Sequence, residues 1–119
     1  MAKIIVIVVA ALHFYFMVLE MFLWTKPRGL KTFRMSLPQA QSTAVLAANQ
    51  GLYNGFLAAG LVWSVVHPNS EVGQQLALFF LACVLCAGVY GAYSVNKRIL
   101  FVQGLPALLG IAAILATAF

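Results

Sequence analysis

Charged residues are scarce in this chain of 119 residues: Asp, Glu, Lys and Arg make up 8% of it, whereas hydrophobic residues make up 64%. A soluble domain carries about a quarter of its residues as charges, so the composition excludes an ordinary water-soluble fold. Acidic residues are the scarcest, with only Glu20 and Glu71. The net charge of +5 comes from basic residues that mostly lie between apolar segments. That arrangement is typical of a membrane protein rather than of a nucleic-acid-binding surface.

Cysteine and histidine are also few, and this argues against a metal or redox site. Cys83 and Cys86 lie inside an apolar run, without the polar flanks of a redox pair, so we expect two small buried thiols. His13, Glu20 and several amides are a poor ligand set for a transition metal. No glycine-rich phosphate loop is present. We therefore expect neither a metal nor a cofactor.

Four apolar segments are long enough to cross a bilayer, which takes roughly 20 helical residues. They cover residues 4–24, 43–66, 76–95 and 99–119. Only helices and closed barrels satisfy the backbone in lipid, and four uninterrupted segments are too few for a barrel. The sequence therefore predicts an all-α fold, an antiparallel bundle of four transmembrane helices that forms one transmembrane domain over residues 1–119.

The distribution of Lys and Arg predicts the orientation of the bundle. Loop 25–42 contains four of them, loop 96–98 contains two, and the opposite side has only Lys3. Basic residues concentrate in the loops that stay in the cytoplasm. We therefore expect a multi-pass protein of the inner (plasma) membrane, with both loops cytoplasmic and both termini outside.

Helix ends should be marked by residues that stop a helix or cap its first turn. Proline and glycine stop helices, so we expect the first loop to be broken at Pro27, Gly29 and Pro38. Ser, Thr and Asn cap free N–H groups. The candidate caps are Ser42 and Thr43 for the second segment, and Asn69 and Ser70 for the third. Gly104 and Pro106 are expected to kink or loosen the fourth segment.

Small residues recur at helical spacing in the second and third segments. They are Ala47, Gly51, Gly55 and Ala59, and then Gly88 and Gly91. Such residues let two helix backbones approach closely, which promotes helix association in lipid. We interpret them as helix-packing positions within the bundle, with the interface of a homo-oligomer as the alternative.

Polar side chains inside the segments are the candidate site. They are His13, Glu20, Asn49, Gln50, Tyr53, Asn54, Tyr90 and Gln103. Counted from the cytoplasmic end of each segment, most lie in the cytoplasmic third, and His13 and Asn54 lie near the midplane. Ionisable groups in a span usually face the bundle interior and are paired. The pattern predicts a polar pocket open to the cytoplasm, in which Asn49, Gln50, Tyr90 or Gln103 bind Glu20, its one acid. Structural hydrogen bonding between helices is the alternative.

Four blocks of sequence resemble one family of small bacterial membrane proteins. They are His13 with Leu19–Met21 and Trp24, then Asn49–Gly60, Ala87–Gly91 and Gln103–Ala107. These blocks resemble the motifs of the family called domain of unknown function 1304. Together they extend over nearly the whole length of this chain. The resemblance implies a four-helix membrane protein and no particular activity. The motif positions coincide with the polar residues above, which favours a functional pocket.

Three functions remain open on the sequence. The first is a small-solute or proton-coupled transporter that uses Glu20 and works as an oligomer, because four helices are few for a transport path. The second is a membrane enzyme acting on a lipid or quinone-like molecule, with Glu20 as general acid or base. The third is a structural or assembly subunit of a membrane complex. The expected partners are membrane lipid and further copies of the chain, and no nucleic acid.

Overall fold

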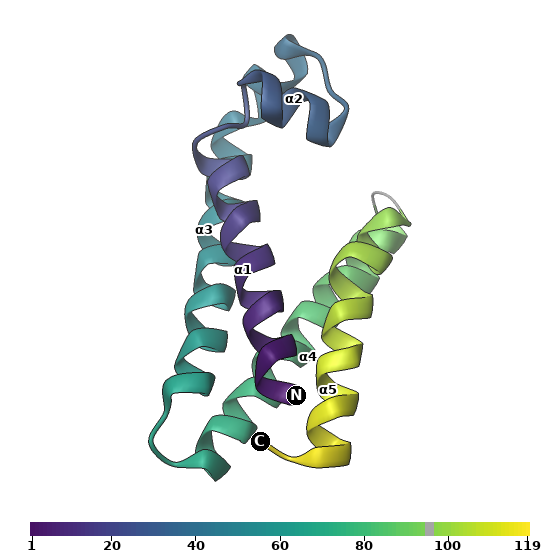
Figure 1. The fold of residues 1–119 in the computed structure, drawn as a ribbon. Coiled ribbons are helices and arrows are strands. Elements are labelled where there is room, and N and C mark those ends of the chain that lie inside the picture. Colours follow the sequence, from purple (N-terminus) through teal and green to yellow (C-terminus); the bar gives the residue numbers. More distant parts are fainter. Residues whose placement is uncertain (95–96) are drawn as a thin grey trace. The chain divides into compact units, whose positions relative to one another are not determined.

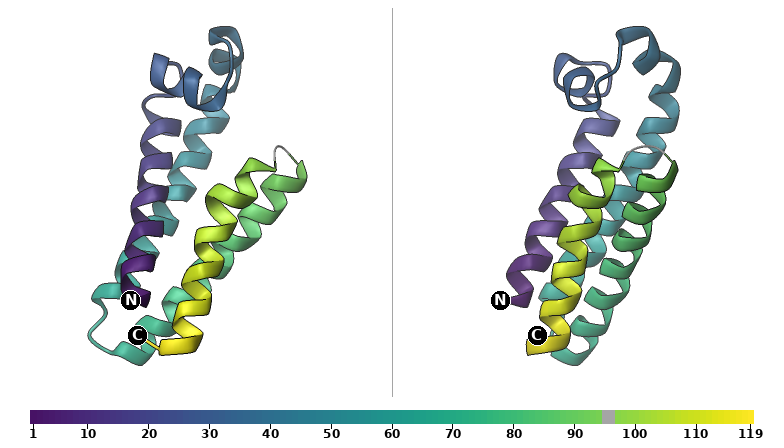
Figure 2. Two further views of the ribbon diagram at one scale, coloured as in Figure 1. Left: turned by 45° about the vertical axis from the view of Figure 1, so that its right-hand side comes forward. Right: turned by 90° about the vertical axis from the view of Figure 1, so that its right-hand side faces the viewer.

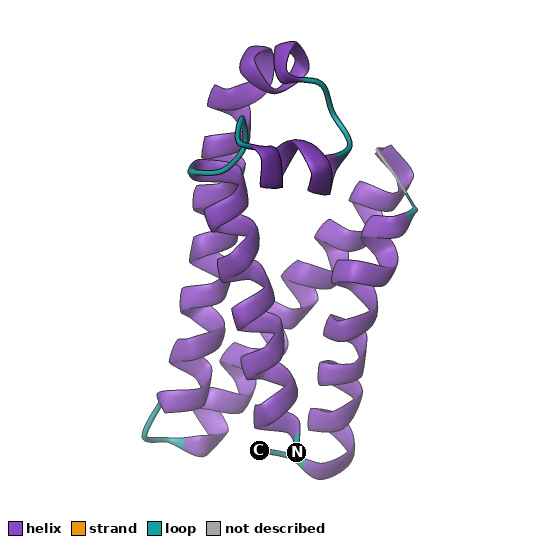
Figure 3. Ribbon diagram, turned by 45° about the horizontal axis from the view of Figure 1, so that its top comes forward, coloured by secondary structure: helices purple, strands orange, loops and turns teal. Residues whose placement is uncertain are grey.

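The computed structural model describes residues 1–94 and 97–119, and within these ranges every element is helical (Figures 1 and 3). The elements in chain order are α1 (Ala2–Met21), α2 (Pro27–Phe33), α3 (Leu37–Val66), α4 (Ser70–Ser94), the π-helical turn η1 (Leu100–Gly104) and α5 (Leu105–Thr117). The all-α prediction is confirmed. The predicted end of the third segment at Val95, and Asn96 of the last loop, lie outside the described residues.

Three helices of the described ranges are long and apolar enough to cross a membrane. They are Ala2–Phe22, Ser70–Ser94 and Leu100–Thr117. Helix α3 is longer than any of them, at 30 residues, but it is not one of the three. Its middle contains Asn49, Gln50 and Asn54, which lower the mean hydropathy of every window that includes them. Three of the four predicted spans thus meet the criteria of length and composition.

Helix α3 begins at Leu37, six residues before the predicted start of the second span at residue 43. Its first turn is closed by a capping box. The N–H of Ser36 donates to the side-chain oxygen of Gln39 at 2.9 Å, and the N–H of Gln39 donates to the hydroxyl of Ser36 at 3.3 Å. The prediction that Ser42 or Thr43 caps this helix is wrong, because both hydroxyls lie inside the helix and donate to the carbonyl of Gln39.

Helix α4 is capped by Asn69, one of the two predicted caps, the other being Ser70. The side-chain oxygen of Asn69 accepts hydrogen bonds from the N–H groups of Glu71 at 3.0 Å and Val72 at 3.2 Å. These groups have no partner within the helix, so Asn69 satisfies two of the free donors of the first turn. Glu71 also places an acid in that turn, where the positive end of the helix dipole favours it.

Helix α2 corrects the prediction of an irregular first loop. It begins at Pro27, and α3 has Pro38 at its second position. Proline is accepted in a first turn because its missing N–H would have had no partner there. Gly29 does not break α2 either. A Cβ at this position would collide with the carbonyl oxygen of Leu23, so glycine is what allows α2 to lie against the end of α1.

The chain divides into two compact units, each of which is described by itself. One unit consists of Met1–Ala11 and Leu57–Phe119, and the other is Leu12–Phe56. Helices α1 and α3 each contribute to both units. The first unit therefore contains the start of α1, the end of α3, and the antiparallel pair formed by α4 with η1 and α5 (Figure 2).

The first unit has an apolar core built from four of its helical segments. Its fully or nearly fully buried members are Ala2, Val6, Val9, Ala10, Leu61, Ala77, Leu81, Val84, Ala107 and Ile114. Glycines bring the α4–α5 pair together. A Cβ at Gly88 would lie 2.8 Å from the backbone nitrogen of Gly104, and one at Gly91 would lie 2.8 Å from the side chain of Ile99. The two helices of this hairpin thus come into close backbone contact where Gly88 faces Gly104.

The loosening predicted near Gly104 and Pro106 takes a specific form. Residues Leu100–Gly104 make a π-helical turn, and the N–H of Leu105 donates to the carbonyl of Leu100, five residues earlier. Pro106 stands directly after this turn, in the first turn of α5. A π-turn widens the helix by one residue, and such turns recur at functional sites. Here it lets Gly104 face Gly88 at close range.

Candidate functional site

The candidate site lies in the second unit, where α1 and α3 pack against each other over two glycines. A Cβ at Gly51 would lie 2.8 Å from the side chain of Met21, 3.0 Å from Cβ of Glu20 and 3.2 Å from the carbonyl oxygen of Met17. A Cβ at Gly55 would lie 2.7 Å from the sulfur of Met17. The two glycines remove the side chains that would otherwise hold the helices apart, so neighbouring polar groups can reach across.

At this contact the carboxyl group of Glu20 is buried and bound by amides of α3. Its side chain is 4% exposed and that of Asn54 is 8% exposed. The amide nitrogen of Asn54 donates to Oε1 of Glu20 at 2.5 Å, and the amide of Gln50 also hydrogen-bonds this carboxyl group. Gln50 and Asn54 are one helical turn apart, so they approach the acid from the same face of α3. An acid within a candidate span is thus paired with two neutral donors.

His13 lies farther along the same helix and is fully buried. Its ring meets that of Phe16 edge to face, with 5.4 Å between the ring centroids. Positions 13, 17 and 20 share one face of α1, so Met17 stands between the imidazole of His13 and the carboxyl group of Glu20. This sulfur-bearing side chain also fills the space beside Gly55. Met17 thus lies between the imidazole of His13 and the carboxyl group of Glu20 on this face of α1.

Two other predicted site residues of α3 point away from the acid. Asn49 and Tyr53 are both exposed, and the ring of Tyr53 packs edge to face on that of Phe56 at 5.8 Å. Small residues of the same helix differ as well: Ala47 and Gly51 are buried, Gly55 is half-buried and Ala59 is exposed. Asn49 and Gln50 were both predicted as partners of Glu20; the structure has Gln50 there together with Asn54, and Asn49 is exposed instead.

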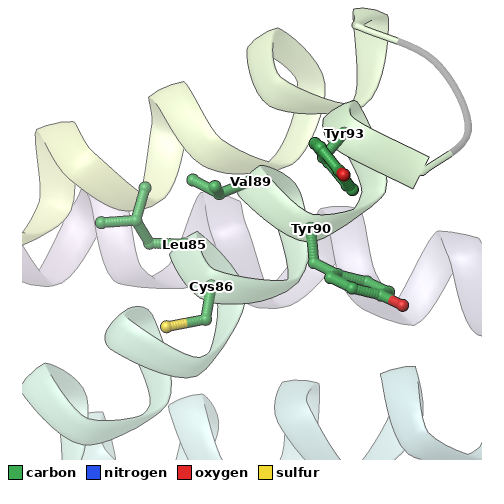
Figure 4. Close-up of a pocket in the computed structure, with 5 residues that line it drawn as sticks. All are labelled: Leu85, Cys86, Val89, Tyr90 and Tyr93. Carbon is green, nitrogen blue, oxygen red and sulfur yellow. The ribbon is translucent and has the colours of Figure 1, made fainter.

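Tyr90 and Gln103 belong to the first unit and are described with it. Tyr90 is exposed on α4 and lines a shallow apolar groove, in which the rings of Tyr90 and Tyr93 point outward (Figure 4). The rest of the lining is Leu85, Cys86 and Val89. Gln103 is half-buried within the π-turn. The cysteines were expected to be buried thiols, but Cys83 is half-buried and Cys86 is exposed, since α4 turns that face outward.

Helix α2 and the turn before it form a second feature, which sequence reasoning missed. Trp24 donates from its indole nitrogen to the hydroxyl of Thr43 at 3.1 Å, and its ring packs on that of Phe33 at 4.8 Å. Arg28 donates to the phenol oxygen of Tyr15 at 2.9 Å. These contacts tie α2 to both α1 and α3. The sequence signal was present, because Ser36 and Gln39 have the spacing of a capping box directly after a short segment that starts with proline.

Comparison with known proteins assigns the chain to a family. The profile of a family described as "Protein of unknown function (DUF1304)" matches residues 7–115. The chain belongs to this family. It is also 28% identical over 107 residues to a protein of Lactococcus lactis subsp. lactis (strain IL1403) described as "Uncharacterized protein YpaA", a match that covers 88% of each chain. No solved structure matches the chain.

Family membership confirms the resemblance seen in the sequence. The matched region of this DUF1304 protein includes both partners of the buried hydrogen bond, Glu20 and Asn54, and also α2. It leaves out only the first six and last four residues. Within the described ranges, no three His, Cys, Asp or Glu side chains gather as they would around a metal ion. The observed contacts of the site join one carboxyl group to two amides, and the imidazole of His13 lies two turns away on α1.

Proposed function

We propose that this DUF1304 protein crosses the bacterial inner membrane four times, with α3 as the remaining span. Helix α3 has 30 residues, which is about 45 Å at 1.5 Å per residue and more than a bilayer core needs. It runs antiparallel to α1 and packs on it from Thr43, bound by Trp24, to Gly55, which contacts Met17. A helix that packs on a membrane-spanning neighbour over this length crosses with it. The basic residues then put residues 25–42 and 96–98 in the cytoplasm and both termini outside.

We propose that the protein moves protons or a small cationic solute across this membrane, through a site centred on Glu20. The observation that carries the proposal is the burial of this carboxyl group in a candidate span, with Asn54 and Gln50 as its partners. A carboxyl group in a membrane is costly to keep and is found mainly on ion and proton pathways. His13 is a second proton carrier on the same helix face, two turns away.

A proton-flux assay in liposomes tests the proposal directly. Purified protein is reconstituted, a pH gradient is imposed, and its decay is followed with an enclosed pH dye. We expect the native protein to speed the decay, and Glu20→Gln to slow it at least tenfold. The matched control is Glu71→Gln, which removes the other acid of the chain, in the exposed first turn of α4. The assay is repeated with small cationic solutes in place of the proton gradient. Transport through this site would be excluded if the native protein gave no more flux than empty liposomes, or if Glu20→Gln left the flux of every solute unchanged.

An assembly subunit is the second candidate, and one observation favours it. Among the described residues, no buried side-chain nitrogen or oxygen lacks a hydrogen-bond partner. Polar groups that are all paired are also what helix association alone would produce. In that case Glu20→Gln leaves flux at the background of empty liposomes and lowers only the stability of the protein or its yield in a larger complex.

We further propose that the working form is a homo-oligomer joined along α3. Asn49 is exposed on that helix, one residue before the amide that binds Glu20. An amide facing lipid has no hydrogen-bond partner, which is costly, whereas two copies of Asn49 can bind each other. Chemical crosslinking in native membranes should yield a dimer or larger assembly, which Asn49→Leu reduces. A monomer at all protein concentrations would rule this out.

A further inference from the structure

The segment Leu23–Arg34, which we call the basic headpiece, has a charge pattern that the site around Glu20 does not explain. It contains Lys26, Arg28, Lys31 and Arg34, and all four are exposed. The unit that contains it, residues 12–56, has a single acid, the buried Glu20. No carboxylate of its own unit is therefore available at the surface to pair with the headpiece. Any anionic group that pairs with these four charges therefore comes from outside that unit.

The fold places these charges where membrane headgroups would be. Helix α2 lies across the ends of α1 and α3 rather than along them (Figures 1 and 3). Its inner face is fixed, because Gly29 lies against the carbonyl groups of Leu23 and Trp24, and Phe33 packs on Trp24. With α1 upright in a bilayer, α2 lies in the plane of the interface, with aromatic rings beside it and basic side chains outward. Interfacial helices have this composition.

The backbone of Arg34 is a second, independent observation. This residue has φ 52° and ψ 53°, the left-handed conformation, at the end of α2. Glycine adopts this conformation without cost and is the usual residue at that position, whereas a side chain makes it unfavourable. A helix end that uses arginine where glycine fits better retains a charge at the expense of local backbone energy. Backbone outliers of this kind cluster at functional sites, which adds support for a role of this side chain.

We propose that the basic headpiece binds the phosphate headgroups of anionic phospholipids at the cytoplasmic surface. Lys26, Lys31 and Arg34 provide cations on the exposed side of α2. Arg28 is held by Tyr15 of α1, which fixes one guanidinium at the level of the span. A cluster of basic residues beside a transmembrane helix attracts anionic lipid by about fivefold for each residue near the surface. The ligand is thus a lipid phosphate, in place of the carboxylate that the unit lacks.

Competition between lipids in detergent tests this inference with the full-length chain. The protein is mixed with equal amounts of phosphatidylglycerol and phosphatidylcholine, and the lipids that stay bound are counted by native mass spectrometry. We expect a preference for phosphatidylglycerol that falls as salt rises. Lys26→Gln with Lys31→Gln should lower that preference about 25-fold, from two residues at about fivefold each. The control is Lys3→Gln, which removes an exposed lysine at the start of α1, on the outer side in the proposed topology, and should lower the preference little.

The same assay identifies a different source of the phosphate. Inorganic phosphate added at millimolar concentration should leave the bound phosphatidylglycerol in place. Displacement by inorganic phosphate would mean that the headpiece binds a soluble anion, and this would overturn the inference. An equal fall in the headpiece variant and in Lys3→Gln, or no preference in the native chain, would overturn it as well. None of these results depends on transport, so a failure here and a failure of the flux assay are distinguishable.

Discussion

At the scale of single residues, Asn54 is the side chain whose loss should be felt most in the second unit. It donates the hydrogen bond to the buried Glu20, and Asn49, five residues earlier on α3, is exposed. We expect Asn54→Ala to destabilise the protein by about 1 kcal/mol, the usual range for a hydrogen bond between membrane helices. Unfolding in mixed micelles at increasing SDS measures this. Asn49→Ala in monomeric protein should change the free energy of unfolding by much less, and equal effects would contradict the pairing.

Arg34 allows backbone strain and charge to be separated. Because this residue is left-handed, Arg34→Gly should stabilise the chain in neutral detergent by roughly 1 kcal/mol, whereas Arg34→Ala should not. Both changes remove the same charge, so both should weaken retention of phosphatidylglycerol to the same extent. The comparison needs unfolding curves and lipid counts for the two variants. A stability that does not distinguish Gly from Ala would argue against the left-handed conformation.

At the scale of the element, the two glycines of the α1–α3 contact should respond differently to the same substitution. A Cβ at Gly51 meets Cβ of Glu20 and the backbone oxygen of Met17, neither of which can move away. A Cβ at Gly55 meets only the flexible end of Met17. We expect Gly51→Ala to cost about 1–3 kcal/mol through overpacking. Gly55→Ala should be neutral or stabilising, because alanine favours a helix by up to about 1 kcal/mol. SDS unfolding of both variants measures the order, and the reverse order would contradict this packing.

The start of α3 gives a prediction about a cap. Ser36→Ala removes one half of the capping box with Gln39 and should destabilise the helix end by about 1 kcal/mol. Ser42→Ala is the matched change of a serine that lies inside the helix, and it should have little effect. Circular dichroism during thermal unfolding in detergent compares the two. A larger effect at Ser42 would mean that the helix starts at the residue we first expected.

The elements show how far the sequence could be interpreted. Long apolar runs predicted α1, α4 and the η1–α5 helix, because lipid requires such runs whatever their packing. Helix α2 was missed because proline and glycine were taken as helix breakers, although Pro27 lies in a first turn and Gly29 in a close contact. Proline and glycine can end a helix, or they can be accepted in its first turn or at a close helix contact, and both outcomes follow from the same backbone rules. Only the position relative to a helix end decides which of them applies.

Depth alone predicted one of the two partners of Glu20, Gln50, and missed the other, Asn54. Counting from Trp24 and Thr43 treated residues 22–24 as helical, but α1 ends at Met21 and α3 starts at Leu37. The two helices therefore pair about one turn out of the assumed register. This brings Asn54 rather than Asn49 to the acid. The sequence therefore predicted which polar residues lie within the helices. Which of them pair depends on where each helix ends, and the sequence did not predict those ends.

At the scale of the whole molecule, the number of spans decides on which side of the membrane each turn lies. If α3 crosses, α2 and the turn at His67–Asn69 lie on opposite sides; if it does not, they share one side.

Cys83 and Cys86 are first replaced by alanine, and Thr32→Cys or Pro68→Cys is then introduced at an exposed position. A thiol reagent that cannot cross the membrane should label position 68 in intact cells, and position 32 only after lysis. The amides of α3 are the reason for expecting this despite its lower hydropathy, because Asn54 is buried against Glu20 of α1 and Gln50 also binds that carboxyl group. Labelling of both positions from the same side would leave three spans and would remove the basis for a transport path through Glu20.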